Sequence, residues 1–186
     1  MKAISFVTCA LMLCVSTIAL SQSEMRKPDS QQSDAQQAPT QLAFARLKTL
    51  AGNWKGQSPV GRLRVSMRVT SGGSALMHEM VPEGRSDDPT HGDDDPVTMF
   101  YTDGDRLMLT HYCDSGDNRP RMVGKVSPDG KTVEFDFLDL SGSTKFGHMH
   151  RAVFTVIDAD HHTEDWTYMT PANMPNVAHI DLVRAK

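Results

Sequence analysis

Hydrophobic and polar side chains alternate with a period of two along most of the chain after residue 52, which is typical of half-buried β-strands. Just before this region, apolar residues recur at helical spacing between Leu42 and Ala51. Thr40 is a candidate N-cap for that short helix, and Gly52 can end it. The predicted strands cover residues 53–57, 62–70, 75–81, 97–102, 106–113, 121–127, 132–138, 150–158, 163–170 and 177–184.

The links between the predicted strands have the composition of tight turns. Asp103-Gly104 and Pro128-Asp129-Gly130 are hairpin signals, and no helix of useful length separates two strands, which excludes a parallel sheet. An antiparallel meander of this size usually closes on itself, because closure removes its two unpaired edges. We therefore predict an all-β fold over residues 42–186: a single antiparallel up-and-down β-barrel of about ten strands with a short N-terminal helix.

The first residues have a different composition. Lys2 is followed by an apolar run to Leu20, and small residues at positions 19 and 21 predict a secretory signal peptide over residues 1–21. An uncleaved anchor is the alternative. Residues 22–41 are rich in Gln, Ser, Asp and Pro, which predicts a disordered linker. We expect a periplasmic or secreted protein that is not stably inserted in a membrane once the signal is removed.

The composition and charge limit the possible classes of function. Charged residues make up 23% and hydrophobic residues 39%, which is enough for a globular core. A formal net charge of -4 and a pI near 6.0 argue against a nucleic-acid partner, which requires a basic face. Cys113 is the only cysteine after the predicted signal, so the barrel is expected to fold without an intramolecular disulfide. The sequence leaves the oligomeric state open.

Several motifs resemble a known group of barrels. The predicted helix leads into Gly52-Asn53-Trp54, and further motifs follow at residues 110–113, 118–122 and 164–167. Together they look like the lipocalin-like barrels, related to calycins and nitrobindins, of exported bacterial proteins that carry a domain-of-unknown-function label. The resemblance implies a ten-stranded barrel with Trp54 near its floor, and no established reaction. The Gly-rich, Pro-containing stretch that nitrobindins have after this motif is missing, which argues against haem.

Strand parity predicts which side chains meet inside the barrel, because alternate residues of a strand share a face. If the face with Phe135 and Phe137 is the lumen, His111, Cys113 and His150 face it too. Arg121 is a candidate anchor for an acidic group, since arginine binds carboxylates bidentately. We expect a small apolar or amphipathic ligand with a polar or acidic head, bound by His111, Cys113, Arg121, Phe135, Phe137, His150 and Phe154.

A metal site is the alternative prediction. The side chains of His148 and His150 point the same way on a strand, about 7 Å apart at Cα, so that they can share one metal ion with a third ligand. His111 is the preferred third ligand, and Cys113, Glu164 and His179 are further candidates. The alternative function is thus a zinc- or copper-dependent enzyme or metal-binding protein using His111, His148 and His150. The simpler explanation of the pair is two polar residues at the start of a strand, one of them near a loop.

Three other polar patterns bear on the chemistry of the chain. His111-x-Cys113 places a base near a thiol nucleophile, although a buried cysteine beside a hydrogen-bonded histidine gives the same pattern, so catalysis stays open. The aspartates at 87–88 and 93–95 lack the alternate spacing of a calcium loop, which predicts a solvated loop. His161 and His162 are predicted to be a surface pair in a hairpin.

Overall fold

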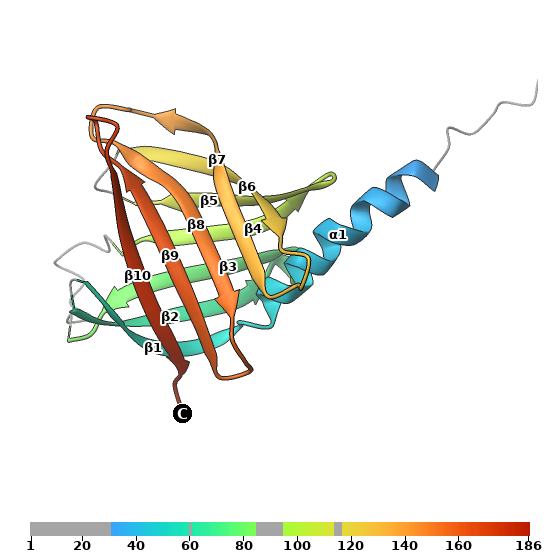
Figure 1. Cartoon of the computed structure of the whole chain (residues 1–186), viewed down its shortest axis with the longest axis horizontal. Coiled ribbons are helices and arrows are strands. Elements are labelled where there is room, and N and C mark those ends of the chain that lie inside the picture. Colours follow the sequence, from blue (N-terminus) through green and yellow to red (C-terminus); the bar gives the residue numbers. More distant parts are fainter. Residues whose placement is uncertain (1–30, 60, 85–94, 114–116) are drawn as a thin grey trace, which may run out of the picture. The chain divides into compact units, whose positions relative to one another are not determined.

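The structure is a computed structural model that describes residues 31–59, 61–84, 95–113 and 117–186, with side chains from residue 39 onward. The predicted signal peptide, residues 22–30 of the predicted linker and most of the acidic run lie outside this part of the chain. Figure 1 shows the helix and the strands that follow it. The elements are α1 (Gln31–Lys48), β1 (Gly52–Ser58), β2 (Gly61–Thr70), a 3-10 turn (Ser71–Gly73), β3 (Ala75–Pro82), β4 (Val97–Asp103), β5 (Arg106–Tyr112), β6 (Asn118–Val126), β7 (Thr132–Gly142), β8 (His148–Val156), β9 (His161–Met169) and β10 (Pro175–Arg184).

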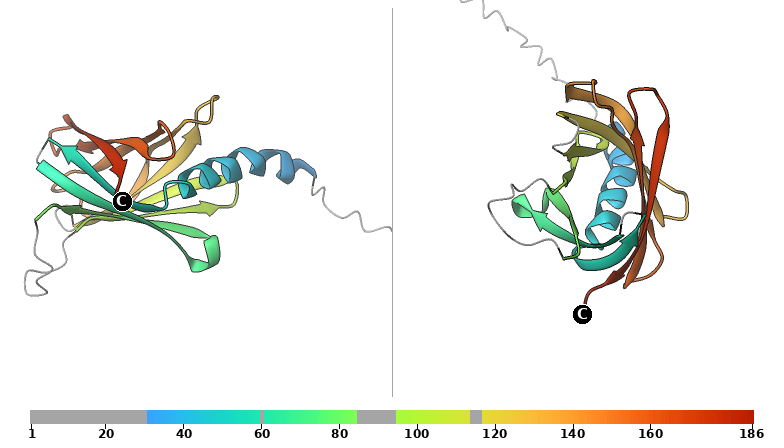
Figure 2. Two further views of the ribbon diagram at one scale, coloured as in Figure 1. Left: turned by 90° about the horizontal axis from the view of Figure 1, so that it is seen from below. Right: turned by 90° about the vertical axis from the view of Figure 1, so that its left-hand side faces the viewer.

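The strands form one closed antiparallel barrel. Each strand pairs with its neighbours in the sequence, and β1 pairs with β10 to complete the ring, with Trp54 opposite Arg184. The right-hand view of Figure 2 looks into the barrel, with the strands arranged around α1. The predicted fold class, an up-and-down barrel of ten strands preceded by a short helix, is confirmed for the residues that the structure describes.

The turns follow the predicted chemistry, whereas some element boundaries differ. Gly104 and Gly130 have φ angles of 62° and 69°, a left-handed backbone that suits glycine in the β4–β5 and β6–β7 hairpins. The helix begins at Gln31 and not after Thr40. Thr40 therefore lies inside the helix, and its hydroxyl donates a hydrogen bond of 2.6 Å to the carbonyl of Asp105.

Helix α1 covers one end of the barrel. In an up-and-down barrel successive turns alternate between the two ends, and polar side chains of α1 bind the turns at one of them. Arg46 donates to the carbonyl of Gly130 at 2.9 Å and Lys48 to that of Gly73 at 3.5 Å. The opposite side of the helix is apolar and buried, through Phe44 and Leu47. The helix therefore seals this end.

The Gly-x-Trp motif forms the floor beneath the helix. Trp54 is completely buried, and its indole N–H donates a 2.8 Å hydrogen bond to the carbonyl of Leu50. The guanidinium of Arg184 lies 4.1 Å from the Trp54 ring centroid and donates to the carbonyl of Ala51 at 3.0 Å. A Cβ atom on Gly52 would lie only 2.4 Å from Nη1 of Arg184, and its φ of 139° also favours glycine. The motif thus makes room for the arginine that ties the last strand to the helix.

Aromatic side chains fill the middle of the barrel. The rings of Phe100, Phe135 and Phe154 contact one another with centroids 5.2 to 6.1 Å apart, and all three are buried. They belong to a continuous apolar core that also includes Trp54 and the buried side of α1. No helix within the described residues is both long and apolar enough to cross a lipid bilayer.

Candidate functional site

A cavity of about 400 Å³ occupies the end of the barrel that α1 leaves uncovered. Its walls come from the β1–β2 turn, the facing ends of β3 and β4, the end of β5 and the start of β10. Most of the lining is apolar and includes Leu63, Met80, Pro82, Met149, Trp166 and Ile180. Polar side chains of Thr98, His78 and His111 lie on the inner wall. Such a cavity can hold a small molecule with few polar groups.

A charged network lies directly beneath the cavity. The carboxylate of Glu164 on β9 is completely buried. His78 on β3 contacts both of its oxygens from across the barrel, with Nε2 at 3.2 and 3.1 Å. His162 Nε2 lies 3.1 Å from Oε1, and the indole N–H of Trp166 donates to Oε2 at 2.9 Å. An ionised carboxylate only accepts hydrogen bonds, so both histidines carry a proton on Nε2 and donate it.

The network keeps Glu164 ionised. Burial raises the pKa of this carboxyl, but the charge of His78 and the hydrogen bonds from His162 and His78 outweigh burial and hold the pKa far below its ordinary value. A buried carboxylate requires charge compensation, and His78 forms an ion pair with Glu164 when its ring is protonated, with Nε2 3.1 Å from Oε2. The Nδ1 atoms of His78 and His162 are buried and have no hydrogen-bond partner among the described residues.

His111 on β5 is an uncharged polar group of the cavity wall. Its Nδ1 lies 2.9 Å from the hydroxyl of Thr98 on the neighbouring strand, and its ring packs 5.5 Å from that of Trp166. Burial, and then the charge of His78, lower the pKa of His111 to about 4. The imidazole is therefore neutral at pH 7 and offers one N–H donor and one acceptor nitrogen.

The structure separates four of the seven predicted ligand-binding residues into two groups. His111 and Cys113 line the cavity, as their shared face predicts. Phe135 and Phe154 instead belong to the packed core below the His78–Glu164 pair and do not line the cavity. The lumen is thus divided into a filled half next to α1 and a hollow half at the opposite end.

Arg121 does not face the lumen. Along β6, Pro120 and Met122 are buried whereas Arg121 is exposed, so its side chain lies on the outer surface. There its Nε and Nη2 donate to both carboxylate oxygens of Asp139 at 2.7 and 2.6 Å. Parity correctly predicted that Arg121 and Met122 occupy opposite faces, but the choice of Arg121 as an inward anchor was wrong because Met122 is the buried residue of the two.

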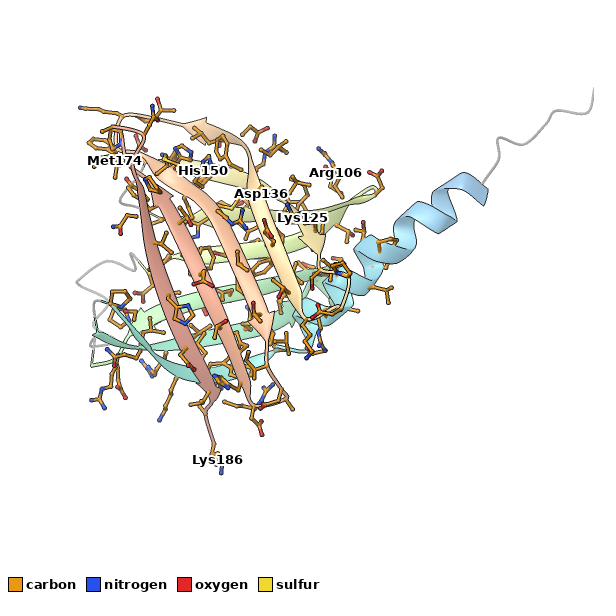
Figure 3. All side chains as sticks on the ribbon, viewed as in Figure 1. Arg106, Lys125, Asp136, His150, Met174 and Lys186 are labelled. Carbon is orange, nitrogen blue, oxygen red and sulfur yellow. The ribbon has the colours of Figure 1, made fainter. Side chains whose placement is uncertain are left out.

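A β-bulge changes the predicted orientation of the His148–His150 pair. The pairing of β8 with β9 shifts between Met149 and Arg151, which breaks the alternation of faces at this point. Met149 therefore lines the cavity, and His148 and His150 do not. Both histidine rings pack on Phe137, with centroids at 4.5 and 5.2 Å. His150 is labelled in Figure 3. Partial burial, and then His150, lower the pKa of His148.

The predicted metal trio does not converge. His111 packs against Trp166 and Thr98, while Nε2 of His148 lies 3.1 Å from Nδ1 of His150. Across the described residues, no three His, Cys, Asp or Glu side chains are arranged to hold a metal ion. The metal hypothesis based on His111, His148 and His150 therefore lacks the geometry that it requires.

The functional side chains that sequence reasoning missed are His78 and His162. The prediction that His162 lies on the surface with His161 is wrong. His162 is completely buried and contacts Glu164, whereas His161 binds Asp181 on the neighbouring strand β10 at 2.7 Å. Parity along β9 carried the signal, because His162 and Glu164 share a face with the large aromatic Trp166. Nothing in the sequence around His78 marks it out, since its partner lies 86 positions away.

Comparison with known proteins supports the fold. No family model matches the chain, and no curated protein matches it. The crystal structure of Rv2717c from M. tuberculosis is similar, with a TM-score of 0.56 and 13% sequence identity over 77% of this chain and 98% of that one. A protein of unknown function of the DUF3598 family from Nostoc punctiforme has a TM-score of 0.37 and 10% identity, over 75% of this chain and 48% of its own. At such identities the likeness to Rv2717c concerns the barrel fold alone, and membership of the lipocalin-like family stays a prediction.

The buried network predicts a large stability cost for Glu164→Gln. The substitution removes the charge that compensates His78 and replaces an acceptor oxygen by an N–H₂ group that faces a donor, so we expect the free energy of unfolding to fall by about 3–5 kcal/mol. Urea unfolding at pH 7 measures it. The matched control is Glu134→Gln on the outer face, where Glu134 lies 3.3 Å from Lys125 and its side chain is 24% exposed; a loss of about 0–1 kcal/mol is expected there. Equal effects of the two substitutions would contradict the assignment.

The depressed pKa of His111 predicts a stability loss in acid. Because its folded pKa of about 4 lies below the ordinary value of 6.5, the unfolded chain binds the proton first as pH falls. The contribution is complete above about pH 6.5 and disappears toward pH 4, with a magnitude of roughly 3 kcal/mol. Urea titrations from pH 7 to 4 should show a smaller loss for His111→Asn than for the unsubstituted protein. The control, His179→Asn on the exposed surface, should not reduce the loss. A parallel pH dependence of His111→Asn and the unsubstituted protein would exclude a buried neutral imidazole.

Proposed function

We propose that this protein binds a small, mostly apolar molecule in the cavity at the open end of the barrel. The observation that carries the proposal is the cavity itself. Its volume of about 400 Å³ falls in the range of small-molecule sites, and most of its wall is apolar. A well-packed barrel of this strand number can be filled entirely by its own side chains, so an apolar hollow of this size is more than packing requires.

The inner wall is rigid enough to define a site. His111 is fixed by Thr98 and Trp166, and Trp166 is held in turn by its hydrogen bond to Glu164. A polar group supported in this way loses little freedom when a ligand binds, which favours affinity and orientation. The apolar part of the ligand would contact Met80, Met149 and Ile180, of which the flexible methionines can adapt to different shapes.

The other end of the cavity is accessible from solvent. Val177 lines it and is 56% exposed, and Arg62 lines it with a side chain that is 75% exposed. Both lie on strands next to the β1–β2 and β9–β10 turns, so a ligand would enter between these turns without opening the sealed end beneath α1.

Filling the cavity tests the proposal. Ala178 lines the cavity wall on β10, directly opposite Trp166 of β9. Ala178→Trp places a large side chain in the hollow, so binding of the neutral fluorescent probe N-phenyl-1-naphthylamine should weaken at least tenfold in a fluorescence titration. Val183→Trp is the matched control, because it adds the same side chain to the same strand at an exposed position that does not line the cavity; its affinity should equal that of the unsubstituted protein. Equal binding by all three proteins, or by none, would count against a ligand site.

We also propose that the protein is exported. The proposal rests on the apolar run between Lys2 and Leu20 with small residues around position 21. N-terminal sequencing of the protein purified from its producing cells should find a start near Gln22 or Glu24. A cytosolic species that retains Met1 would contradict export without affecting the proposed cavity function.

A further inference from the structure

The cavity wall, as far as the structure describes it, provides no buried lysine or arginine for an acidic ligand. Among the described residues that line the cavity, Arg62 is the only lysine or arginine. It lies at the exposed end, and its Nε is already bound to the carboxylate of Glu83 at 2.9 Å. A ligand carboxylate buried in the cavity would require a cationic partner, because an unpaired buried carboxylate is costly. The outward position of Arg121 removes the other candidate.

The charges beneath the inner wall already compensate each other. His78 lines the cavity, but its Nε2 binds both oxygens of Glu164, which is the only carboxylate that His78 contacts within the described part of the chain. An incoming carboxylate near His78 would compete with Glu164 for the same positive charge and would be repelled by it. The network therefore disfavours a second negative charge.

His111 supplies a neutral polar contact at the inner wall, and it suits a hydroxyl group. Its Nδ1 is engaged with the Thr98 hydroxyl, and Nε2 has no hydrogen bond within the described residues. If Thr98 donates to Nδ1, Nε2 carries the proton and donates to a ligand; if Nδ1 donates to Thr98, Nε2 accepts. A ligand hydroxyl satisfies either case because it both donates and accepts, whereas a carboxylate satisfies only the first.

We infer that the cavity selects uncharged ligands, namely apolar alcohols or phenols, over the corresponding carboxylates. The inference rests on the proposed function and specifies its ligand class. The hydroxyl binds His111 Nε2 at the inner wall, and the hydrocarbon part lies along Met80, Met149 and Ile180. The expectation of an acidic head is thereby replaced by that of a neutral one.

Two matched pairs of ligands test this selectivity. Isothermal titration calorimetry at pH 7.5 compares 1-decanol with decanoate and 2-naphthol with 2-naphthoate, with N-phenyl-1-naphthylamine as a general probe of the cavity. We expect the alcohol or phenol to bind at least tenfold more tightly than its carboxylate in at least one pair, with no pair showing the reverse. In His111→Phe, the affinity for that alcohol or phenol should fall about fivefold, and the probe should still bind.

A second variant does not depend on the folding of His111→Phe. Met80→Lys introduces a cation into the cavity wall at a partly exposed position, from which its long side chain can reach solvent. It should shift the preference toward decanoate at least tenfold relative to 1-decanol. Met77→Lys, on the same strand but outside the cavity lining, is the control and should leave the preference unchanged.

The outcomes separate the two proposals. If the probe binds and neither pair favours its alcohol or phenol, or one pair favours the carboxylate, the selectivity is overturned and the binding function stands. If the probe binds but none of the four ligands does, the inferred ligand class is overturned as well. Failure of the probe and of all four ligands overturns the binding function itself.

Discussion

The carboxylate of Glu164 lies in the interior of the barrel with none of its surface exposed. A buried charge requires hydrogen-bond donors or an opposite charge in direct contact with it. Three donors converge on it, from His78, His162 and Trp166. Because β3 and β9 are not neighbours in the ring, the contact with His78 spans the lumen and fixes the distance between opposite walls. The aromatic core lies on one side of this contact and the cavity on the other, so the ion pair acts as a partition across the barrel.

The partition also determines the polarity of the cavity. The charge of His78 opposes protonation of His111, which burial already disfavours, so the cavity wall contains a neutral imidazole where many ligand sites contain a cation. The same ion pair holds Trp166 in place beside His111. The buried carboxylate of Glu164 thus fixes Trp166 beside His111, and His111 stays uncharged. The binding proposal rests on this fixed, neutral polar group in an apolar cavity.

The alternating pattern predicted most of the fold and only part of the site. The strands and turns could be predicted because they depend on local sequence. Gly104 and Gly130, for example, each mark a hairpin turn. His111 and Cys113 were found because β5 keeps its parity to the end. His150 was misplaced because the bulge beside Met149 is set by pairing with β9 and leaves no mark in the sequence. Arg121 was misplaced because its partner Asp139 lies 18 positions away on the outer face. His78 and Glu164 lie 86 positions apart in the sequence and contact each other across the lumen. The alternation of faces along single strands does not predict such a contact.

The floor built by Arg184 has a consequence for the order in which the chain can fold. This arginine joins Ala51 across 133 positions of sequence, and β1 finds its second partner only in β10. Hairpins from β2 to β9 can form as soon as each is synthesised, but the ring stays open until the last strand arrives. During that time the edges of β1 and β9 are unpaired, and the loop whose ends must meet is nearly as long as the domain, which makes closure entropically slow. Closure of the barrel is therefore deferred until the last strand has been synthesised, and a chaperone that shields these two edges would act at the most vulnerable step.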